Sequence, residues 1–456
     1  SDTLGLSTTV TATVRVLTRQ LQSLKGVAVP EPSTLSAFVK NRAAAIALGK
    51  ALFWDVQVSS DGSAACATCH FQAGADVRLK NQMNPGTLRT GNPAMTFETS
   101  RTGAANGPNY VVKPGDFPRY VLSNPADANS PVVYQTKDVQ GSHGQFLRNF
   151  VSADPGAVED ACVVTADPVF GAYRRTTGRN SPTVVNAVFN VRNFWDGRAN
   201  STFNGVDSFG ARNTTATIYR GTPPVATTVS IDNASLASQA VSAPLNSGEM
   251  SCDGRTWPEI GKRLLAATVL ARQNVAGTDS VLGTYAVTGG KGLGRNYDTM
   301  VRAAFFDDLH SSSTPISING KSYTQIQANF SLFFGLAVQM YEATLVSDQA
   351  PIDSYFANYP STTVSNPAAL SADAITGMNV FNGKGRCVSC HHGPQLTNAA
   401  TPAREAAAIG ALISRMRMGN GEAGAYDLGF YNLGVRPTSE DLGVGGTDPM
   451  GNPLSF

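Results

Sequence analysis

A Cys-x-x-Cys-His pattern occurs twice in this 456-residue chain, and it constrains the fold more than any other feature of the sequence. The first motif lies in SAACATCHFQ and the second in GRCVSCHHGP, more than three hundred residues later. Their members are Cys66, Cys69 and His70 in the first motif, and Cys387, Cys390 and His391 in the second.

Three kinds of site use closely spaced cysteines, and the histidine separates them. A structural zinc site pairs two sets of ligands at short range, and a redox dithiol needs no histidine. Two thiols followed by a histidine are the attachment signature of c-type haem, in which the histidine ligates the iron. The two copies therefore predict two covalently bound haems, with zinc and plain disulfides as the alternatives.

The composition indicates a folded, globular protein. Hydrophobic residues make up 42% and charged residues 15%, which provides sizeable cores and too little charge for a disordered chain. The length predicts two or three domains. Lys and Arg number 35 against 33 Asp and Glu, so nothing favours nucleic acid or an anionic membrane as partner. The best apolar run, 330–338, is half of the roughly 18 residues of a membrane span, and we expect none.

Two cysteines, Cys162 and Cys252, lie outside the motifs and are the right number for one disulfide. The bond would close a loop of about ninety residues and contribute on the order of 4 kcal/mol. A disulfide together with covalent haem indicates the periplasm or the cell exterior. Because the N-terminus lacks a charged start followed by an apolar stretch, we expect that a secretory leader has already been removed.

Apolar residues at helical spacing precede both motifs, at 43–55 and at 371–385. In the second of these segments Ser371 is a good N-cap and Gly383 a good helix stop. A third apolar stripe, at 324–347, predicts a core helix.

The remaining sequence predicts a mainly α, loop-rich fold: two cytochrome c-like haem domains with long insertions and few short strands. Residues 72–160 and 200–245 are rich in Gly, Pro, Asn, Ser and Thr and are expected to form the loops. We divide the chain into an N-terminal segment, 1–42, a first haem domain, 43–320, and a second haem domain, 321–456, which is incomplete at its C-terminus.

Three stretches resemble the bacterial dihaem cytochrome c peroxidase and MauG superfamily, and they occur in the family's order. They are LFWDVQVSSDGSAACATCH at 52–70, RNSPTVVNAVFNVRNFWDGRA at 179–199 and FYNLGVRPTSEDLG at 430–443. The resemblance implies that the first haem reacts with peroxide and that the second is a low-spin electron-transfer haem. His70 would then be the proximal ligand of the first iron and His391 a ligand of the second. His392 cannot reach the opposite face of the same haem, because it directly follows His391.

The segment SQAVSAPLNSGEM, at 238–250, is similar to the family's distal segment. Gln239, Pro244 and Glu249 match its Gln, Pro and Glu, although the spacing is one residue longer before Pro244 and one shorter after it. The resemblance implies that Glu249 is the acid/base, which takes a proton from the near oxygen of bound peroxide and returns it to the departing oxygen. Gln239 and Pro244 are implied to belong to the same catalytic group.

The FWDGR turn carries two further candidates. Trp195 matches the tryptophan that passes electrons between the haems in this family, with a core tryptophan as the alternative. Arg198 is suited to pair with a haem propionate, since a guanidinium recognises carboxylates with two hydrogen bonds. Asn180 matches an asparagine that helps to hold a structural calcium ion, for which an amide oxygen is a suitable ligand.

The chain departs from the family near its end. It stops at GNPLSF, before the family's Thr-Pro-x-Leu-Arg-Asn stretch and His-Asp-Gly turn, which precede the second ligand of the second iron. We therefore expect an N-terminal portion of a longer protein, completed by a C-terminal fragment or a homodimer partner. Met416 and Met418 are candidates for a local substitute ligand, with gap-filling or surface methionines as the alternative.

Two more histidines lie outside the family motifs. A lone histidine is more often a structural hydrogen-bonding group than a ligand, and this is expected of His310. His143 lies in a loop region from which it could swing onto the first haem in a resting state.

The leading functional hypothesis is a dihaem oxidoreductase that reduces hydrogen peroxide at the first haem with electrons relayed from the second. The electron donor would be a small cytochrome or copper protein, or a protein side chain as in MauG-type enzymes. One alternative is a rubber-oxygenase-like dihaem dioxygenase, against which Glu249 argues, since that branch lacks the distal glutamate. Another is a non-catalytic electron-transfer cytochrome, in which the distal segment would have no role.

Overall fold

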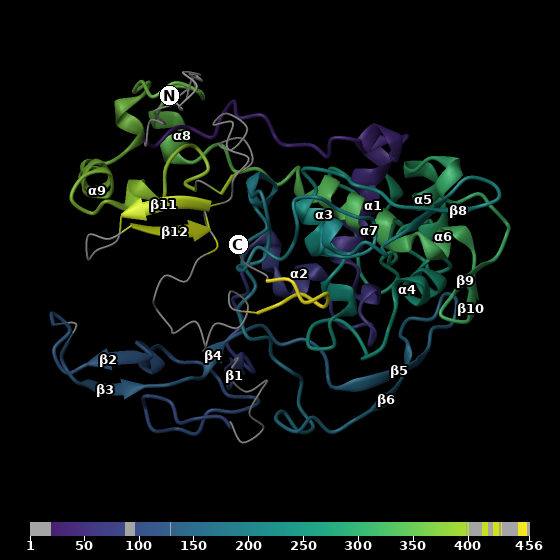
Figure 1. The fold of residues 1–456 in the computed structure, drawn as a ribbon, viewed down its shortest axis with the longest axis horizontal. Coiled ribbons are helices and arrows are strands. Elements are labelled where there is room, and N and C mark those ends of the chain that lie inside the picture. The colour runs from purple at the N-terminus through teal and green to yellow at the C-terminus, as the bar shows by residue number, and fades with distance from the viewer. Residues whose placement is uncertain are drawn as a thin grey trace, which may run out of the picture. The chain divides into compact units, whose positions relative to one another are not determined.

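The computed structural model describes residues 20–86, 96–127, 129–397, 399–400, 413–417, 423–427, 430 and 446–453. The chain forms two compact units, which are considered separately: a smaller unit of residues 1–28 and 347–429, and a larger unit of residues 29–346 and 430–456 (Figure 1).

The larger unit is built around a small set of helices joined by long loops. Its helices are α1 Arg42–Trp54, α2 Cys66–Cys69, α3 Ser235–Ala240, α4 Trp257–Leu264, α5 Tyr297–Ala304, α6 Gln325–Ala328 and α7 Phe330–Glu342. The segment expected to precede the first motif is therefore confirmed as a helix. It begins after Asn41, whose side-chain oxygen accepts a hydrogen bond from the backbone N–H of Ala44 (3.1 Å).

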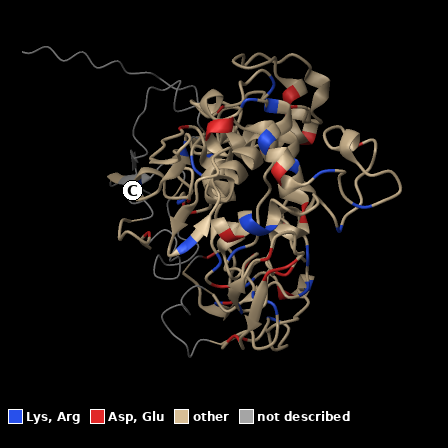
Figure 2. Cartoon of the chain, turned by 90° about the vertical axis from the view of Figure 1, so that its right-hand side faces the viewer, with Lys and Arg blue, Asp and Glu red and all other residues tan. Residues whose placement is uncertain are grey.

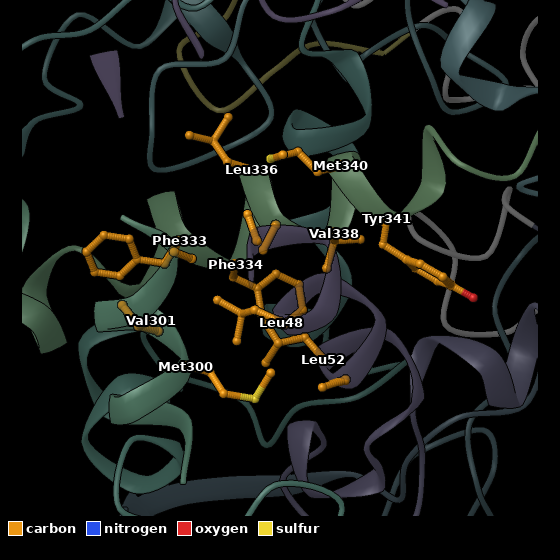
Figure 3. Packing of buried hydrophobic residues seen from close by; sticks show 14 of the residues in the cluster. Leu48, Leu52, Met300, Val301, Phe333, Phe334, Leu336, Val338, Met340 and Tyr341 are labelled. Atoms are coloured by element: carbon orange, nitrogen blue, oxygen red, sulfur yellow. The ribbon is translucent and has the colours of Figure 1, made fainter. Parts of the chain in front are cut away.

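The core of this unit lies where α7 crosses α1, with α3, α4 and α5 packed around the pair (Figure 3). Every residue of α7 is buried, so it is a central helix rather than one with a single buried face. Gly49 allows the two helix backbones to meet: a Cβ there would lie 1.8 Å from the carbonyl oxygen of Ala337. Phe334 and Leu48 fill the space beside this crossing.

The expected core helix at 324–347 is confirmed, with an interruption at Asn329 between α6 and α7. The Asn329 side chain hydrogen-bonds the backbone of Tyr219 in both directions (2.7 and 2.8 Å) and donates to the carbonyl of Leu309 (2.8 Å). These contacts with loops far away in the sequence interrupt the helix at Asn329, although the apolar pattern continues through it.

The strands are short and pair into two-stranded antiparallel sheets. The pairs are β1 Met83–Asn84 with β4 Val139–Gln140, β2 Tyr120–Leu122 with β3 Val132–Gln135, β5 Arg148–Ser152 with β6 Ala161–Val164, β7 Ile218–Arg220 with β8 Val225–Thr227, β9 Ile316–Ile318 with β10 Lys321–Tyr323, and β11 Ile413–Arg417 with β12 Ala423–Asp427. Of these pairs, all but β1–β4 join neighbouring strands in the sequence. The fold is thus helical and loop-rich with short strands, as the sequence indicates, and its description as two haem domains stays a prediction.

The disulfide expected from the cysteine count is present: Cys162 on β6 is bonded to Cys252 (Cα–Cα 6.5 Å). The four motif cysteines form no disulfide.

The smaller unit contains α8 Pro351–Tyr355, α9 Ala372–Asn382 and the β11–β12 hairpin. Ser371 caps α9 by accepting a hydrogen bond from the N–H of Ala374 (3.1 Å), and Gly383 follows its last residue, as expected. The compact units do not divide at residue 320, because α7 belongs to the core of the larger unit.

None of the helices in the described ranges is long and apolar enough to cross a membrane. Basic and acidic side chains are interspersed along the chain, in keeping with its small net charge (Figure 2).

Candidate haem sites

The first motif forms a single helical turn. Cys66 and Cys69 are the first and last residues of α2, so their thiols lie one turn apart on the same side of the helix, and His70 follows immediately. The turn is fixed by Thr68, whose hydroxyl accepts a hydrogen bond from the N–H of Ala65 (2.9 Å). This local structure brings two thiols and an imidazole close together in one helical turn.

The ring of His70 is oriented by a backbone carbonyl. Its Nδ1 hydrogen-bonds the carbonyl oxygen of Pro182 (2.6 Å), and the ring of Phe53 packs beside it (centroids 6.4 Å apart). Burial lowers the pKa of His70, and the bond to Pro182 opposes this only in part. With the proton on Nδ1, a neutral ring keeps Nε2 for a metal, as iron-ligating histidines require.

The second motif repeats this arrangement in the smaller unit. Its cysteines lie in and directly after a 3₁₀ turn, Cys387–Ser389, and the Nδ1 of His391 hydrogen-bonds the carbonyl oxygen of Leu396 (3.0 Å). The ring of Phe381, from α9, lies beside His391 (centroids 6.5 Å apart). Two motifs in separate units thus hold their histidines by Nδ1 and leave Nε2 without a protein hydrogen bond among the described residues.

These donor sets fit covalent haem better than the alternatives. No disulfide joins the four motif cysteines, so their thiols are available for attachment to a porphyrin. In the described ranges, no group of three or more His, Cys, Asp or Glu side chains is arranged to hold a metal ion. Haem c needs only two thiols and one imidazole from each motif, because its porphyrin nitrogens supply further ligands to the iron.

The distal segment lies against the first motif. Gln239 is on α3 and half-buried, Pro244 is buried in the 3₁₀ turn Ala243–Leu245, and Glu249 follows in the next turn. Burial is the largest cause of the raised pKa values of Cys66 and Cys69. The negative charge of Glu249 raises both values further. The structure therefore brings Glu249 close to the thiols that would carry the first haem.

The Glu249 residue is partly buried. Burial raises its pKa, and the positive charge of Arg198 opposes the rise. Its Oε1 accepts a hydrogen bond from the side chain of Asn246 (2.9 Å). A carboxyl group with a raised pKa is well suited both to accept and to donate a proton near neutral pH.

The FWDGR turn places its two candidates differently. The guanidinium of Arg179 stacks on the ring of Trp195, 3.4 Å from its centroid. Arg198 forms an ion pair with Asp196 (2.7 Å) and lies over the ring of Phe194 (3.9 Å). Arg198 is thus already paired within its own turn, and its contact with a propionate stays a prediction.

The structure describes only part of the FYNLGVRPTSEDLG segment, and it shows the hydrogen bonds of Asn180. Phe430, which begins the FYNLG segment, packs on the FWDGR turn, since a Cβ on Gly197 would lie 2.9 Å from its ring. Residues 431–443 and Met418 lie outside the described residues, as does the side chain of Met416. The Asn180 amide accepts a hydrogen bond from Ser142 (3.2 Å) and donates to the carbonyl of Asp76 (3.0 Å), so calcium there stays a prediction.

The ring of His143 lies near the first motif, and both of its nitrogens are engaged by other side chains. Its Nε2 accepts a hydrogen bond from Arg78 (2.9 Å), and its Nδ1 meets the side chain of Gln82 (3.0 Å). Burial and the charge of Arg78 lower the pKa of His143 to about 4. Arg78 also donates to the sulfur of Cys69 (3.2 Å), so it links His143 to the thiol.

Other histidines have structural roles. His310 is buried and engages Arg302 and the carbonyl of Phe305 (both 3.2 Å), as expected of a hydrogen-bonding core histidine. His392 is buried next to the second motif.

Sequence reasoning missed Arg78 and Glu342. Arg78 lies in a loop without any periodic pattern, so nothing in the sequence pointed to it. Glu342 is the single acidic residue of the apolar helix α7, which is a usable signal. It is buried, its pKa is raised by burial to about 8, and its charge acts on Cys66.

Comparison with known proteins agrees with this geometry. The family model described as di-haem cytochrome c peroxidase matches residues 43–135 and 157–360, which is more than half of the chain. The matched residues include the first motif, Trp195 and Glu249, and they end before the second motif. A search of curated proteins finds no match. With the peroxidase pattern extending through the first motif and the distal segment, this chain belongs to the di-haem cytochrome c peroxidase family.

Proposed function

We propose that this protein reduces hydrogen peroxide at a haem attached through Cys66 and Cys69, using electrons relayed from a haem attached through Cys387 and Cys390. The family supports a peroxidase-like oxidoreductase with haem c cofactors. A haem at the first motif would supply the iron that binds peroxide and exchanges electrons with it. The contributions of the chain itself follow from the residues around that motif.

The observation that carries the proposal is the place of Glu249. Its charge acts on both thiols of the first motif, its pKa is raised by burial, and it is the only acidic residue of the segment that matches the family's distal pattern. A carboxylate here can remove the proton from one peroxide oxygen and deliver it to the other as the O–O bond breaks. A carrier of electrons alone would have no use for such a group.

Three other side chains have assigned roles in the proposal. His70, fixed by the carbonyl of Pro182, holds its Nε2 toward the first iron. Trp195 serves as the electron relay, with its ring held by Arg179. Arg198 moderates the pKa of Glu249, which keeps that carboxyl able to lose its proton. Gln239 and Pro244 shape the segment that carries Glu249.

The proposed donor is a small cytochrome or copper protein, or a protein side chain as in MauG-type enzymes. The Cys162–Cys252 disulfide supports a location in the periplasm or outside the cell.

The experiment is to follow the haem absorption and EPR spectra of the purified diferric and half-reduced holoprotein before and after one equivalent of hydrogen peroxide. We expect a rapid change at one high-spin haem, slowed about 100-fold or more in Glu249→Gln. The matched control is Glu259→Gln, where the carboxyl is held by Lys321 and Tyr323 (both 2.7 Å) and the rate should be parental. Two low-spin haems that ignore peroxide in both redox states, or a parental rate in Glu249→Gln, would refute the proposal.

A further inference from the structure

The turn that carries Glu249 is closed by hydrogen bonds to a single residue, Asn246. After the 3₁₀ turn at Ala243–Leu245, the backbone N–H groups of Glu249, Met250 and Ser251 all converge on the carbonyl oxygen of Asn246 (3.0 to 3.1 Å). No regular helix or strand continues through this turn. The position of the Glu249 carboxyl therefore depends on the Asn246 side chain, which donates to its Oε1 (2.9 Å), and on what packs against the turn.

The packing comes from residues 141–165, here named the hairpin segment, which contains β5 and β6 (Figure 1). Its first part touches Glu249 directly. A Cβ on Gly144 would lie 2.3 Å from the carbonyl oxygen of Gly248 and 2.4 Å from that of Glu249, and 2.6 Å from the Glu249 Cα. Only a residue without a side chain lets the two backbones approach so closely.

The second part of the hairpin segment holds the residues just after Glu249. The N–H of Asp253 donates to the carbonyl of Arg148 (2.7 Å), and the N–H of Phe150 donates to the carbonyl of Asp253 (2.9 Å). Next to this pair, the Cys162–Cys252 disulfide joins β6 to the same stretch. The turn is thus fastened to the hairpin by backbone hydrogen bonds and by a covalent bond.

A buried ion pair ties the other end of the turn to the same segment. Asp160 forms ion pairs with the guanidinium groups of Arg255 and Arg263 (2.9 Å to each Nε), and all three side chains are fully buried. Arg255 also donates to the carbonyls of Pro244 (3.3 Å) and Val58 (2.9 Å). It therefore connects the start of the distal segment, the hairpin and the loop that leads to the first motif.

Ser60 joins the same three parts. Its N–H donates to the carbonyl of Met250 (2.8 Å), its hydroxyl accepts from the N–H of Cys252 (2.8 Å), and its carbonyl accepts from the N–H of Asp160 (2.7 Å). Residues 136–156, which include Gly144 and β5, are not matched by the family model. The contacts made by Gly144 and β5 thus lie outside the matched residues, whereas the disulfide, Asp160 and Ser60 lie within them.

We propose that the hairpin segment positions the Glu249 carboxyl over the first motif, with Gly144 and the Cys162–Cys252 disulfide as positioning elements. This inference rests on the proposed role of Glu249. It predicts that shifting the hairpin segment should slow proton transfer while haem attachment, which depends on α2 and His70, is retained.

The test is Gly144→Ala in the holoprotein. Its matched control is Gly107→Ala, at a glycine where a Cβ would meet nothing within 4 Å. The first readout is amide hydrogen exchange over residues 246–253, which we expect to be at least tenfold faster in Gly144→Ala and parental in Gly107→Ala. The second is the rate of reaction with hydrogen peroxide, which we expect to fall at least tenfold in Gly144→Ala with both haems attached.

The double variant Gly144→Ala/Glu249→Gln separates positioning from general damage. If the hairpin segment acts through Glu249, the double variant reacts no more slowly than Glu249→Gln alone. An equal slowing by Gly144→Ala in both backgrounds, or a peroxide rate within twofold of the parent, would overturn the inference while leaving the role of Glu249 intact. A parental rate in Glu249→Gln would overturn both. If Gly144→Ala does not fold, Cys162→Ser/Cys252→Ser is judged by the same criteria.

Discussion

Replacing Glu342 with Gln should stabilise the protein, and the gain should grow with pH. Glu342 ends the buried helix α7, is 6% exposed, and has its pKa raised by burial from 4.5 to about 8. In the unfolded chain the same group ionises near 4.5. Between these two values the folded protein holds a proton that the unfolded chain releases, so the free energy of unfolding falls as the pH rises through this window.

The size of the effect follows from the two pKa values. At about 1.4 kcal/mol for each pH unit, the cost is about 3 kcal/mol at pH 7 and levels off at about 5 kcal/mol above pH 8. Below pH 4 the group is protonated in both states and the cost vanishes. Glutamine keeps the shape of the protonated side chain and does not titrate, so Glu342→Gln should recover this stability.

The assay is urea unfolding of holoprotein and variant at pH 4, 7 and 9, followed by far-UV circular dichroism. The control is Glu259→Gln, whose pKa is lowered: burial acts to raise it, but hydrogen bonds from Lys321 and Tyr323 outweigh burial. Its carboxylate contributes stability that is present above the unfolded pKa and lost in acid, so this variant should be destabilised at pH 7 and less so at pH 4. A stability difference for Glu342→Gln that does not change with pH would refute the reasoning.

Two further predictions concern packing and haem attachment. Gly49→Ala should destabilise the larger unit by about 3 kcal/mol in urea unfolding, because its Cβ would overlap the backbone of Ala337, whereas Gly277→Ala, with open space around it, should change stability by less than about 0.5 kcal/mol. Gly49→Ala with parental stability would contradict the described helix crossing. Cys387→Ala/Cys390→Ala should leave one covalent haem instead of two, measured by intact mass and the pyridine haemochrome spectrum; two retained haems would contradict the assignment of the second motif.

The features that could be predicted from the sequence depend on local residue patterns or on the number of cysteines. The helices before both motifs and the core helix α7 follow from apolar spacing, and Ser371 caps α9 as its position indicates. The disulfide followed from counting cysteines. The distal segment was found by resemblance, and the structure brings Glu249 to the first motif.

The features that the sequence could not predict arise from contacts between distant backbones. The carbonyl of Pro182 orients His70 across more than a hundred residues, and backbone groups carry no residue-specific signal. Gly144 reads as one glycine among 44, and only the folded chain shows that it touches Glu249. Likewise, Asn329 divides α6 from α7 because loops near Tyr219 and Leu309 accept its side chain, which no periodicity records.

The helix α9 has a consequence for how the protein is made. It carries Ile375, Met378, Val380 and Phe381, yet none of its residues is buried among the described parts of the chain. A helix with so many apolar side chains and so little to bury them lacks the driving force to fold by itself. Attachment of the haem to the second motif would then have to precede folding of the smaller unit. When haem is scarce, newly made chains would then remain open in this region and be exposed to proteases, so haem supply would limit how much folded protein accumulates.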